Sequence, residues 1–358
     1  MKIGITGSDG FIGYHTYNNL KFTTKYNVIK LKKDFHKDKR IKKCDWIIHL
    51  AGVNRSNGQN NVYADNIDLT NKLVESVGKN TNIIFASSTQ AADSETMYGK
   101  AKVECEQVIQ LWSQQYGGKF YNLRIPNVFG PFCKPNYNSF VATFCHNVCS
   151  GKDLKVTEDK YINLIYVNDV VEEFKKCIEG DEPSFRTSEI LVSEVAERLS
   201  YFRDSYFNGG MIPKIDTTFD LNLFNTFLSY VPHKKRLIGT ELFSDERGSL
   251  TELAKVDGSE GQVFFSTTNP GKVRGEHFHM RKFERFCVVD GEATIRIRKL
   301  GSKKPYEYKV SGDDIKVIDM PLLYTHNIEN TGKKKLTTVF WINEIFNKQD
   351  TDTYGEKV

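Results

Sequence analysis

The 358-residue sequence predicts two domains of different class: an α/β domain with a doubly wound parallel sheet over residues 1–236, and an all-β jelly-roll barrel over residues 241–358. In the first part, solidly apolar runs alternate with amphipathic stretches, as in parallel sheets covered by helices on both faces. From residue 241 onward, short alternating runs separated by turn signals dominate, which is typical of antiparallel barrels. The basic stretch 232–236 marks the expected boundary.

Uninterrupted apolar runs predict the buried strands of the first domain, at residues 2–6, 28–31, 46–50, 83–87 and 120–125. Apolar residues at helical spacing predict helices at residues 66–77, 98–116, 140–148, 167–178 and 188–202. In the second domain, alternation predicts strands at residues 262–267, 285–289, 293–298, 307–310, 315–318 and 336–342.

Composition excludes several classes of partner. The net charge of +5 is spread along the chain without aromatic stacking motifs, so we expect small anionic ligands and no nucleic acid. No apolar run approaches membrane-spanning length, so we expect no membrane association. Seven cysteines without paired spacing predict reduced thiols and a cytoplasmic protein.

A glycine-rich turn follows the first strand. Residues 6–13 read Thr-Gly-Ser-Asp-Gly-Phe-Ile-Gly and open a helix, so Gly7, Gly10 and Gly13, with Phe11 and Ile12, are expected to hold the pyrophosphate of a dinucleotide, as in Rossmann folds. At the end of the second strand, Lys32 and Lys33 stand where NAD-binding chains carry an acid. A cation there favours NADP(H), while Asp34 keeps NAD open as the alternative.

Tyr98 and Lys102 lie four residues apart, and therefore on one face of the expected helix. A neighbouring ammonium is expected to lower the pKa of the Tyr98 phenol and make it a general acid for a carbonyl oxygen. Ser87, Ser88 and Thr89 close the preceding strand, and a hydroxyl group of this segment is expected to donate to the same oxygen.

A second set of residues has the spacing of metal ligands. His277 and His279 are two apart and would share one face of a strand, and Glu284 follows closely. His326 offers a third imidazole. Three histidines and one carboxylate suit zinc, iron, manganese or nickel, and we expect a divalent metal with zinc as the first candidate.

These residues carry a family resemblance. The glycine turn, His49-Leu50-Ala51-Gly52, Ser88, the Tyr98/Lys102 pair and the segment 124–131 resemble extended short-chain dehydrogenase/reductases that act on nucleotide sugars. The resemblance implies that Ser88, Tyr98 and Lys102 are catalytic, that Leu50, Ala51 and Gly52 adjoin the cofactor, and that Asn127 contacts substrate.

The segments 271–291 and 321–330 resemble the paired motifs of cupins, with Leu323 in place of the usual glycine. Residues 245–249 resemble the entry strand of sugar-nucleotide cupins, in which Arg247 would contact a carboxylate or phosphate. Lys282 and Tyr324 are further substrate-binding candidates, and either of them or His326 could move a proton.

Over nearly its whole length, the chain resembles the family of fused dehydrogenase–cupin enzymes of capsular-polysaccharide synthesis. This implies C3 epimerisation of a UDP-2-acetamido-2,6-dideoxy-hexos-4-ulose in the cupin. NADPH-dependent reduction of the C4 ketone then gives UDP-2-acetamido-2,6-dideoxy-L-talose, in the UDP-N-acetyl-L-fucosamine pathway of capsule or O-antigen synthesis. The resemblance also implies a homodimer. A plain reductase with a structural cupin and a non-catalytic NADP-sensing protein stay open as alternatives.

Overall fold

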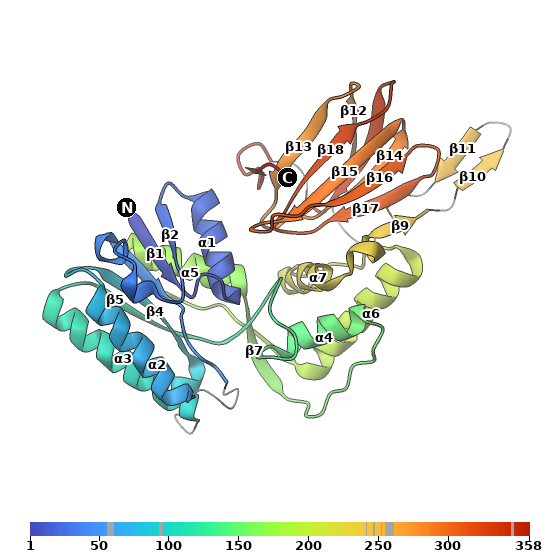
Figure 1. The fold of residues 1–358 in the computed structure, drawn as a ribbon. Coiled ribbons are helices and arrows are strands. Elements are labelled where there is room, and N and C mark those ends of the chain that lie inside the picture. The colour runs from blue at the N-terminus through green and yellow to red at the C-terminus, as the bar shows by residue number, and fades with distance from the viewer. Residues whose placement is uncertain are drawn as a thin grey trace. The chain divides into compact units, whose positions relative to one another are not determined.

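A computed structural model of the full chain gives the fold (Figure 1), and it describes residues 1–55, 61–92, 96–240, 242–245, 248–251, 253–254, 261–344 and 347–358. The chain divides into two compact units. The first comprises Met1–Phe140 and Lys160–Leu191, and the second comprises Val141–Asp159 and Val192–Val358. The two compact units do not coincide with the domain boundary expected near residue 236. That boundary stays a prediction.

The first unit is built on a five-stranded sheet with the strand order β2-β1-β3-β4-β5. All of its pairings are parallel, which confirms the predicted parallel sheet. The strand order reverses between β1 and β3, and in such sheets the ligand binds at that switch point. The strands are β1 (Lys2–Thr6), β2 (Asn27–Leu31), β3 (Trp46–His49), β4 (Asn82–Ser88) and β5 (Phe120–Ile125).

Helices cover both faces of this sheet (Figure 1). Leu20 of one helix and Phe174 of another share an apolar cluster with Ile48, whereas Leu73 lies in a second cluster with Ile47. Because Ile47 and Ile48 are neighbours on β3, the two clusters lie on opposite faces. The first face carries α1 (Phe11–Thr23) and α5 (Val167–Glu179), and the second carries α2 (Val62–Ser76) and α3 (Met97–Tyr116).

A three-stranded sheet completes the first unit and corrects one prediction. It contains β6 (Asn127–Phe129), β7 (Tyr161–Tyr166) and β8 (Ser188–Leu191). The helix predicted at residues 188–202 is wrong at its start, because Ser188–Leu191 pairs antiparallel with β7. The helix itself, α6, spans Val192–Gly209.

The second unit contains two five-stranded sheets of antiparallel strands, with the orders β12-β19-β14-β17-β9 and β16-β15-β18-β13-β20. Their inner faces meet, since the ring of Phe286 on β14 lies 5.4 Å from that of His326 on β18. The strands are β9 (Leu237–Gly239), β12 (Gln262–Thr268), β13 (Val273–Phe278), β14 (Glu284–Asp290), β15 (Glu292–Lys299), β16 (Tyr306–Ser311), β17 (Lys316–Met320), β18 (Tyr324–Asn330), β19 (Leu336–Ile342) and β20 (Tyr354–Gly355), and a separate hairpin joins β10 (Leu242–Asp245) to β11 (Gly248–Thr251).

Three helices belong to the same unit as these strands: α4 (Phe140–Cys149), α6 and α7 (Thr218–Tyr230). The contacts include aromatic packing and a buried hydrogen bond. Phe224 of α7 packs edge-on against Phe283, with 5.2 Å between ring centroids. The hydroxyl of Tyr206 on α6 donates to the carboxylate of Asp319 on β17. These buried contacts explain why the helices group with the C-terminal strands.

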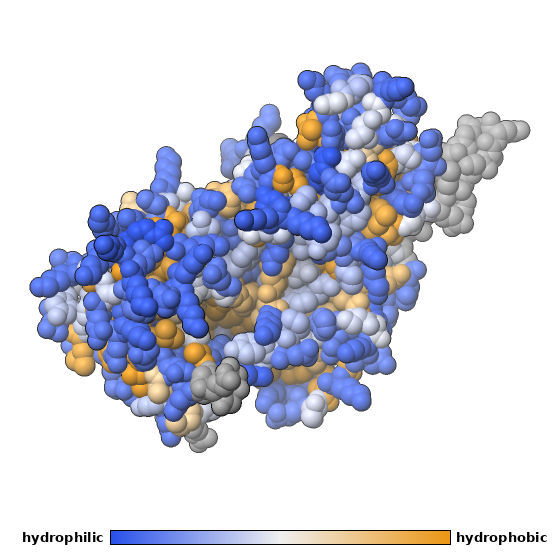
Figure 2. All heavy atoms as spheres, in the orientation of Figure 1, coloured by the Kyte–Doolittle hydropathy of each residue, from blue (hydrophilic) through white to orange (hydrophobic). Residues whose placement is uncertain are grey.

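The face drawn in Figure 2 is mostly hydrophilic, and the cysteine side chains are buried. Hydrophilic side chains cover most of the face drawn in Figure 2, and hydrophobic ones gather there in small groups. All seven cysteines are buried and free of disulfides. Among the described residues, no helix combines the length and apolarity needed to cross a membrane.

Candidate functional site

The glycine turn after β1 has a backbone that side chains would disrupt. Gly7 has a φ of +62°, and a Cβ there would lie 2.7 Å from the backbone of Leu50 and Ala51. A Cβ at Gly13 would lie 2.2 Å from the carbonyl oxygen of Gly7. Helix α1 begins at Phe11, so Gly13 lies in its first turn, and its N-cap Gly10 supplies no side-chain cap. The first N–H groups of α1 can therefore bind an anion.

Thr6 and His49 join this turn to the turn after β3. The hydroxyl oxygen of Thr6 accepts the N–H groups of Leu50 (3.1 Å) and Ala51 (3.2 Å). The same oxygen lies 2.8 Å from Nδ1 of His49. Burial, with a smaller effect of Lys102, lowers the pKa of His49 to about 3. The imidazole is therefore neutral, and its Nδ1 can accept a hydrogen bond from the Thr6 hydroxyl. This bridge was missed in the sequence, where His49 carried no assigned role.

The predicted catalytic residues line one cavity of about 520 Å³ in the first unit. Tyr98 and Lys102 reach it from α3, and Ser88 reaches it from the end of β4. Most of the predicted cofactor residues line the same cavity, namely Gly7, Gly10, Phe11, Ile12, Gly13, Leu50 and Gly52. Residues 134, 137 and 138 also line it, and no motif had singled them out as ligand-binding.

The remaining predicted residues of this unit lie outside the lining of the cavity. Ala51 acts through its N–H bond to Thr6. Asn127 is exposed on β6, whose neighbour Val128 does line the cavity. Lys32 and Lys33 are exposed, one and two residues beyond the end of β2. The nucleotide preference that these lysines suggested therefore stays a prediction.

The electrostatics of Tyr98 differ from the prediction. Burial raises the pKa of Tyr98 to about 12, although a lowered value was expected from the neighbouring lysine. Lys102 is itself buried, and burial lowers its pKa to about 8. Its ammonium lies 5.5 Å from the centroid of the Tyr98 ring and donates to the carbonyl of Ala86 at 2.8 Å. The desolvation of both groups thus outweighs their mutual effect.

A buried carboxylate that the motifs did not indicate lies one turn after Lys102. Glu106 accepts from the hydroxyl of Ser87 at 2.5 Å and forms two bonds with Arg124, at 2.8 and 3.1 Å. Burial alone would raise the pKa of Glu106, but the hydrogen bonds from Arg124 and Ser87 lower it. The network joins α3 to β4 and β5, next to Ser88. The four-residue spacing from Lys102 was the available signal.

The four predicted metal ligands converge in the second unit. His277 and His279 come from the end of β13 and the loop after it, Glu284 from β14, and His326 from β18. One ligand atom from each residue lies within 4.8 Å of those of the other three. Nε2 of His279 and Nε2 of His326 both lie 3.1 Å from Oε2 of Glu284. None of these three buried atoms makes a well-directed hydrogen bond with a described residue.

The hydrogen bonds that the two buried histidine rings make to backbone carbonyls suit a cation between the four ligand atoms. Nδ1 of His279 and Nδ1 of His326 face the backbone carbonyls of Asp352 (2.6 Å) and Tyr324 (3.2 Å), which leaves both Nε2 lone pairs for a metal. Burial and the two neighbouring histidines lower the pKa of His277 to about 4, so it is neutral. Burial would raise the pKa of Glu284, but the two imidazoles hold it well below its usual range.

The predicted substrate residues of the second unit are placed differently from one another. Lys282 is 2% exposed, and its ammonium donates to the carbonyl of Thr351 at 3.2 Å. Tyr324 is buried, with the Arg236 guanidinium 4.9 Å from its ring centroid. Arg247 lies outside the described residues. Lys282 therefore supports the loop that carries the metal ligands.

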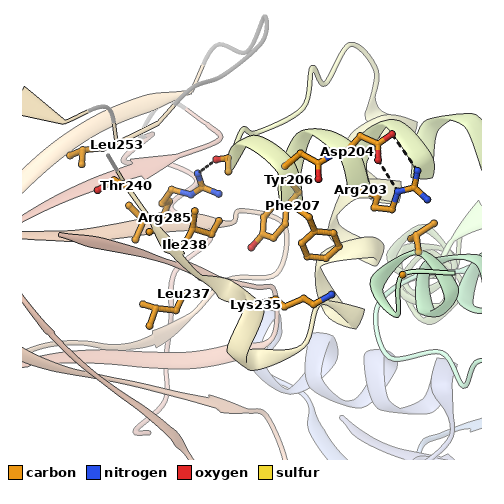
Figure 3. A pocket seen from close by; sticks show the side chains of 16 residues that line it. Arg203, Asp204, Tyr206, Phe207, Lys235, Leu237, Ile238, Thr240, Leu253 and Arg285 are labelled. Carbon is orange, nitrogen blue, oxygen red and sulfur yellow. Dashed lines mark hydrogen bonds and ion pairs between the residues drawn. The ribbon is translucent and has the colours of Figure 1, made fainter. Parts of the chain in front are cut away.

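A cavity of about 840 Å³ also lies in the second unit, between α6 and the strands β9, β14 and β17 (Figure 3). Arg285 lies in its wall, where it pairs with Asp319 at 2.7 Å and donates to the carbonyl of Gly210 at 2.6 Å. Among the described residues, none of the predicted site residues lines this cavity. Arg203 in the same wall pairs with Asp204 at 2.8 Å.

Comparisons with known families match both parts of the chain. Residues 3–186 match the NAD dependent epimerase/dehydratase family, and residues 243–354 match the polysaccharide biosynthesis C-terminal domain.

Relatives align with both parts of the chain. The chain is 32% identical to a UDP-2-acetamido-2,6-beta-L-arabino-hexul-4-ose reductase of Pseudomonas aeruginosa, over 99% of this chain and 98% of that protein. It is 35% identical to the crystal structure of the capsular polysaccharide assembling protein CapF from Staphylococcus aureus, with a TM-score of 0.63 and full coverage of both chains. A structure of CapF with the inhibitor 3-isopropenyl-tropolone matches at 33% identity and a TM-score of 0.57, again over both full chains.

Proposed function

The chain belongs to the CapF-type enzymes, within the NAD dependent epimerase/dehydratase family, and on that basis we propose that it is a bifunctional nucleotide-sugar enzyme. The C-terminal domain, a cupin, epimerises a UDP-2-acetamido-2,6-dideoxy-hexos-4-ulose at C3. The N-terminal domain then reduces its C4 ketone with NADPH to UDP-2-acetamido-2,6-dideoxy-L-talose, for capsule or O-antigen synthesis in the cytoplasm. The observation that carries the reductase is the cavity shared by Ser88, Tyr98, Lys102 and the glycine turn.

The reduction requires a hydride at C4 and a proton at the ketone oxygen. NADPH supplies the hydride when bound, and the sterically closed glycine turn at Gly7 and Gly13 fits its pyrophosphate. Tyr98, with a pKa of about 12, is protonated at neutral pH and can donate its hydroxyl proton to the oxygen. The Lys102 ammonium stabilises the resulting phenolate. Ser88 donates a hydrogen bond to the ketone oxygen of the substrate.

The epimerisation uses the acidity of C3–H next to a ketone. A divalent metal, with zinc as the expected ion, would be held by His277, His279, Glu284 and His326, and it would stabilise negative charge on the ketone oxygen. The three buried ligand atoms without directed hydrogen bonds support this assignment. Proton removal at C3 and return from the opposite face invert that centre. Tyr324, Lys282 and His326 are the candidates for moving this proton, and the ammonium of Lys282 donates to the carbonyl of Thr351.

Oxidation of NADPH in the presence of the UDP-linked 4-keto-6-deoxy amino sugar tests the reductase. The unchanged chain should turn over, and Tyr98→Phe should lose about 10²–10⁴-fold in kcat, because it removes the general acid. Tyr116→Phe is the matched control: it removes a phenol from the same helix, outside the cavity lining. Full activity of Tyr98→Phe would exclude this phenol as the proton donor.

A further inference from the structure

The C-terminal segment of the chain is built into the candidate metal site. Strand β20 pairs antiparallel with β13, with Gly355 opposite His277 and Tyr354 opposite Phe278. The N–H of Glu356 donates to the carbonyl of Glu276 at 2.9 Å, which continues the pairing. The last residues therefore lie alongside the strand that carries the first metal ligand.

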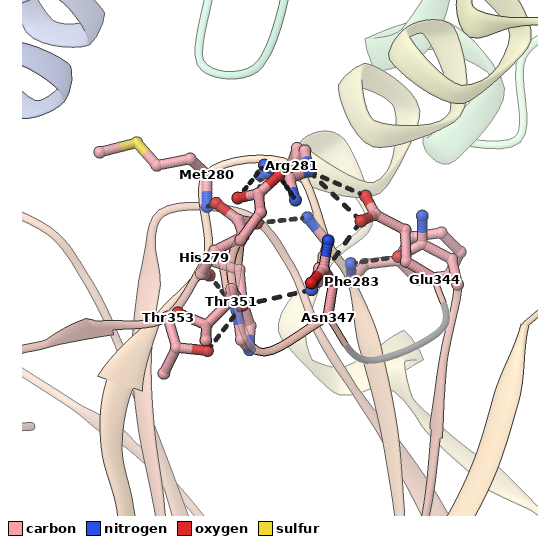
Figure 4. Close-up of polar contacts among 12 residues, drawn as sticks. His279, Met280, Arg281, Phe283, Glu344, Asn347, Thr351 and Thr353 are labelled. Atoms are coloured by element: carbon pink, nitrogen blue, oxygen red, sulfur yellow. Dashed lines mark hydrogen bonds and ion pairs between the residues drawn. The ribbon is translucent and has the colours of Figure 1, made fainter. Parts of the chain in front are cut away.

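Asp352 closes the loop between two ligands. It is 3% exposed, and its carboxylate accepts three consecutive N–H groups, from Met280 (3.2 Å), Arg281 (2.9 Å) and Lys282 (3.0 Å). These residues belong to the loop that joins His279 to Glu284. In Figure 4 this loop faces the C-terminal segment, with Arg281 directed toward Glu344. One carboxylate thus fixes the backbone that separates the two ligands.

The backbone of Asp352 also contacts a ligand directly. Its carbonyl oxygen accepts from Nδ1 of His279 at 2.6 Å, which directs the Nε2 lone pair toward Glu284. Asp352 has a φ of +43°, in the left-handed region that aspartate and asparagine enter more readily than most residues. This conformation lets the carbonyl and the carboxylate of one residue bind the same loop.

We propose that Asp352 is a positioning residue of the metal centre, which sets the orientation of His279 and the spacing of His279 from Glu284. The inference rests on the metal site of the proposed function. Its neighbour Asp350 provides the contrast: it is exposed, and among the described residues it pairs with the side chain of Arg281 alone, at 2.7 Å. Loss of Asp350 leaves the three N–H bonds and the His279 contact in place.

Zinc affinity of the full-length protein, measured by competition with a chromophoric chelator, tests this role. Asp352→Gly keeps the left-handed backbone and removes the carboxylate. It should weaken zinc binding about 10–100-fold, the range found when groups that orient metal ligands are lost. Asp352→Asn keeps the size of the side chain but presents one amide N–H₂ to backbone donors, so it should weaken binding in the same direction. Asp350→Asn should bind as the unchanged chain does.

The absorption spectrum of the cobalt(II)-loaded forms gives a second measurement, because it reports ligand geometry. It should change in both Asp352 variants and stay constant in Asp350→Asn. Equal zinc affinity and equal cobalt spectra in all forms would overturn the role of Asp352 and leave the metal centre intact. Failure of the unchanged chain to bind zinc or cobalt would instead overturn the metal centre itself. NADPH binding, measured in each variant, verifies that the first unit is folded.

Discussion

Leu323 occupies a backbone position that suits glycine. We therefore expect the glycine variant at this position to be more stable than the alanine variant. Its φ is +60°, its N–H donates to the carbonyl of His279 at 3.0 Å, and its carbonyl accepts from Leu300 at 2.9 Å. The two hydrogen bonds hold the turn that leads into β18 and His326. The side chain is 3% exposed, so packing offsets the unfavourable conformation.

Two substitutions separate packing from conformation. Leu323→Ala and Leu323→Gly both remove the buried side chain, at a cost of about 2–5 kcal/mol. At an ordinary position glycine is less stable than alanine by about 0.5–1 kcal/mol. At a left-handed position alanine costs an additional 1–2 kcal/mol or so. Leu323→Gly should therefore be more stable than Leu323→Ala by about 1 kcal/mol, the reverse of the usual order.

Hydrogen exchange of the β18 amides, followed by mass spectrometry, measures this difference as a free energy of opening in the second unit. The unchanged chain should exchange slowest, Leu323→Gly faster, and Leu323→Ala fastest. An alanine variant that protects β18 as well as the glycine variant, or better, would refute the assignment of strain to Leu323.

Three further predictions concern the first unit. Gly13→Ala places a Cβ 2.2 Å from the carbonyl oxygen of Gly7, so the turn must shift. NADPH should then bind at least about tenfold more weakly in a fluorescence titration, and unchanged affinity would contradict the turn geometry. Lys32→Glu should reduce the ratio of kcat/KM with NADPH to that with NADH by about tenfold, and a constant ratio would exclude Lys32 from 2′-phosphate binding. The kcat/KM for reduction should fall as pH rises through about 8, where Lys102 loses its proton. Because its folded pKa lies below its unfolded pKa of 10.5, its contribution to stability should rise from about pH 8 to 10.5, so Lys102→Met should flatten the stability profile.

The parts of the fold that depend on local pattern could be predicted from the sequence. The parallel strands are uninterrupted apolar runs, because both of their faces are covered. Strand β18 was not predicted, and β13 was expected only as the strand that carries His277, because their inward positions carry His326 and His277 where a core strand would carry apolar residues. Strand β8 was predicted as helix because its strand state comes from pairing with β7, a contact distant in sequence.

The candidate site shows the same contrast. Residues with motif spacing, such as Tyr98 and the metal ligands, could be named from the sequence. Glu106, His49 and Asp352 were not named, because their roles arise from contacts between distant segments. The pKa of Tyr98 was predicted in the wrong direction because the sequence indicates a neighbouring cation but does not indicate how deeply both groups are buried.

The most direct test of the two-step account is the structure of the product formed from the 4-keto sugar and NADPH in deuterated water, determined by NMR. The account predicts UDP-2-acetamido-2,6-dideoxy-L-talose, inverted at C3 relative to the substrate and carrying deuterium there. A reduced product that retains hydrogen and the original configuration at C3 would contradict it, and would identify the chain as a reductase whose C-terminal domain performs no epimerisation.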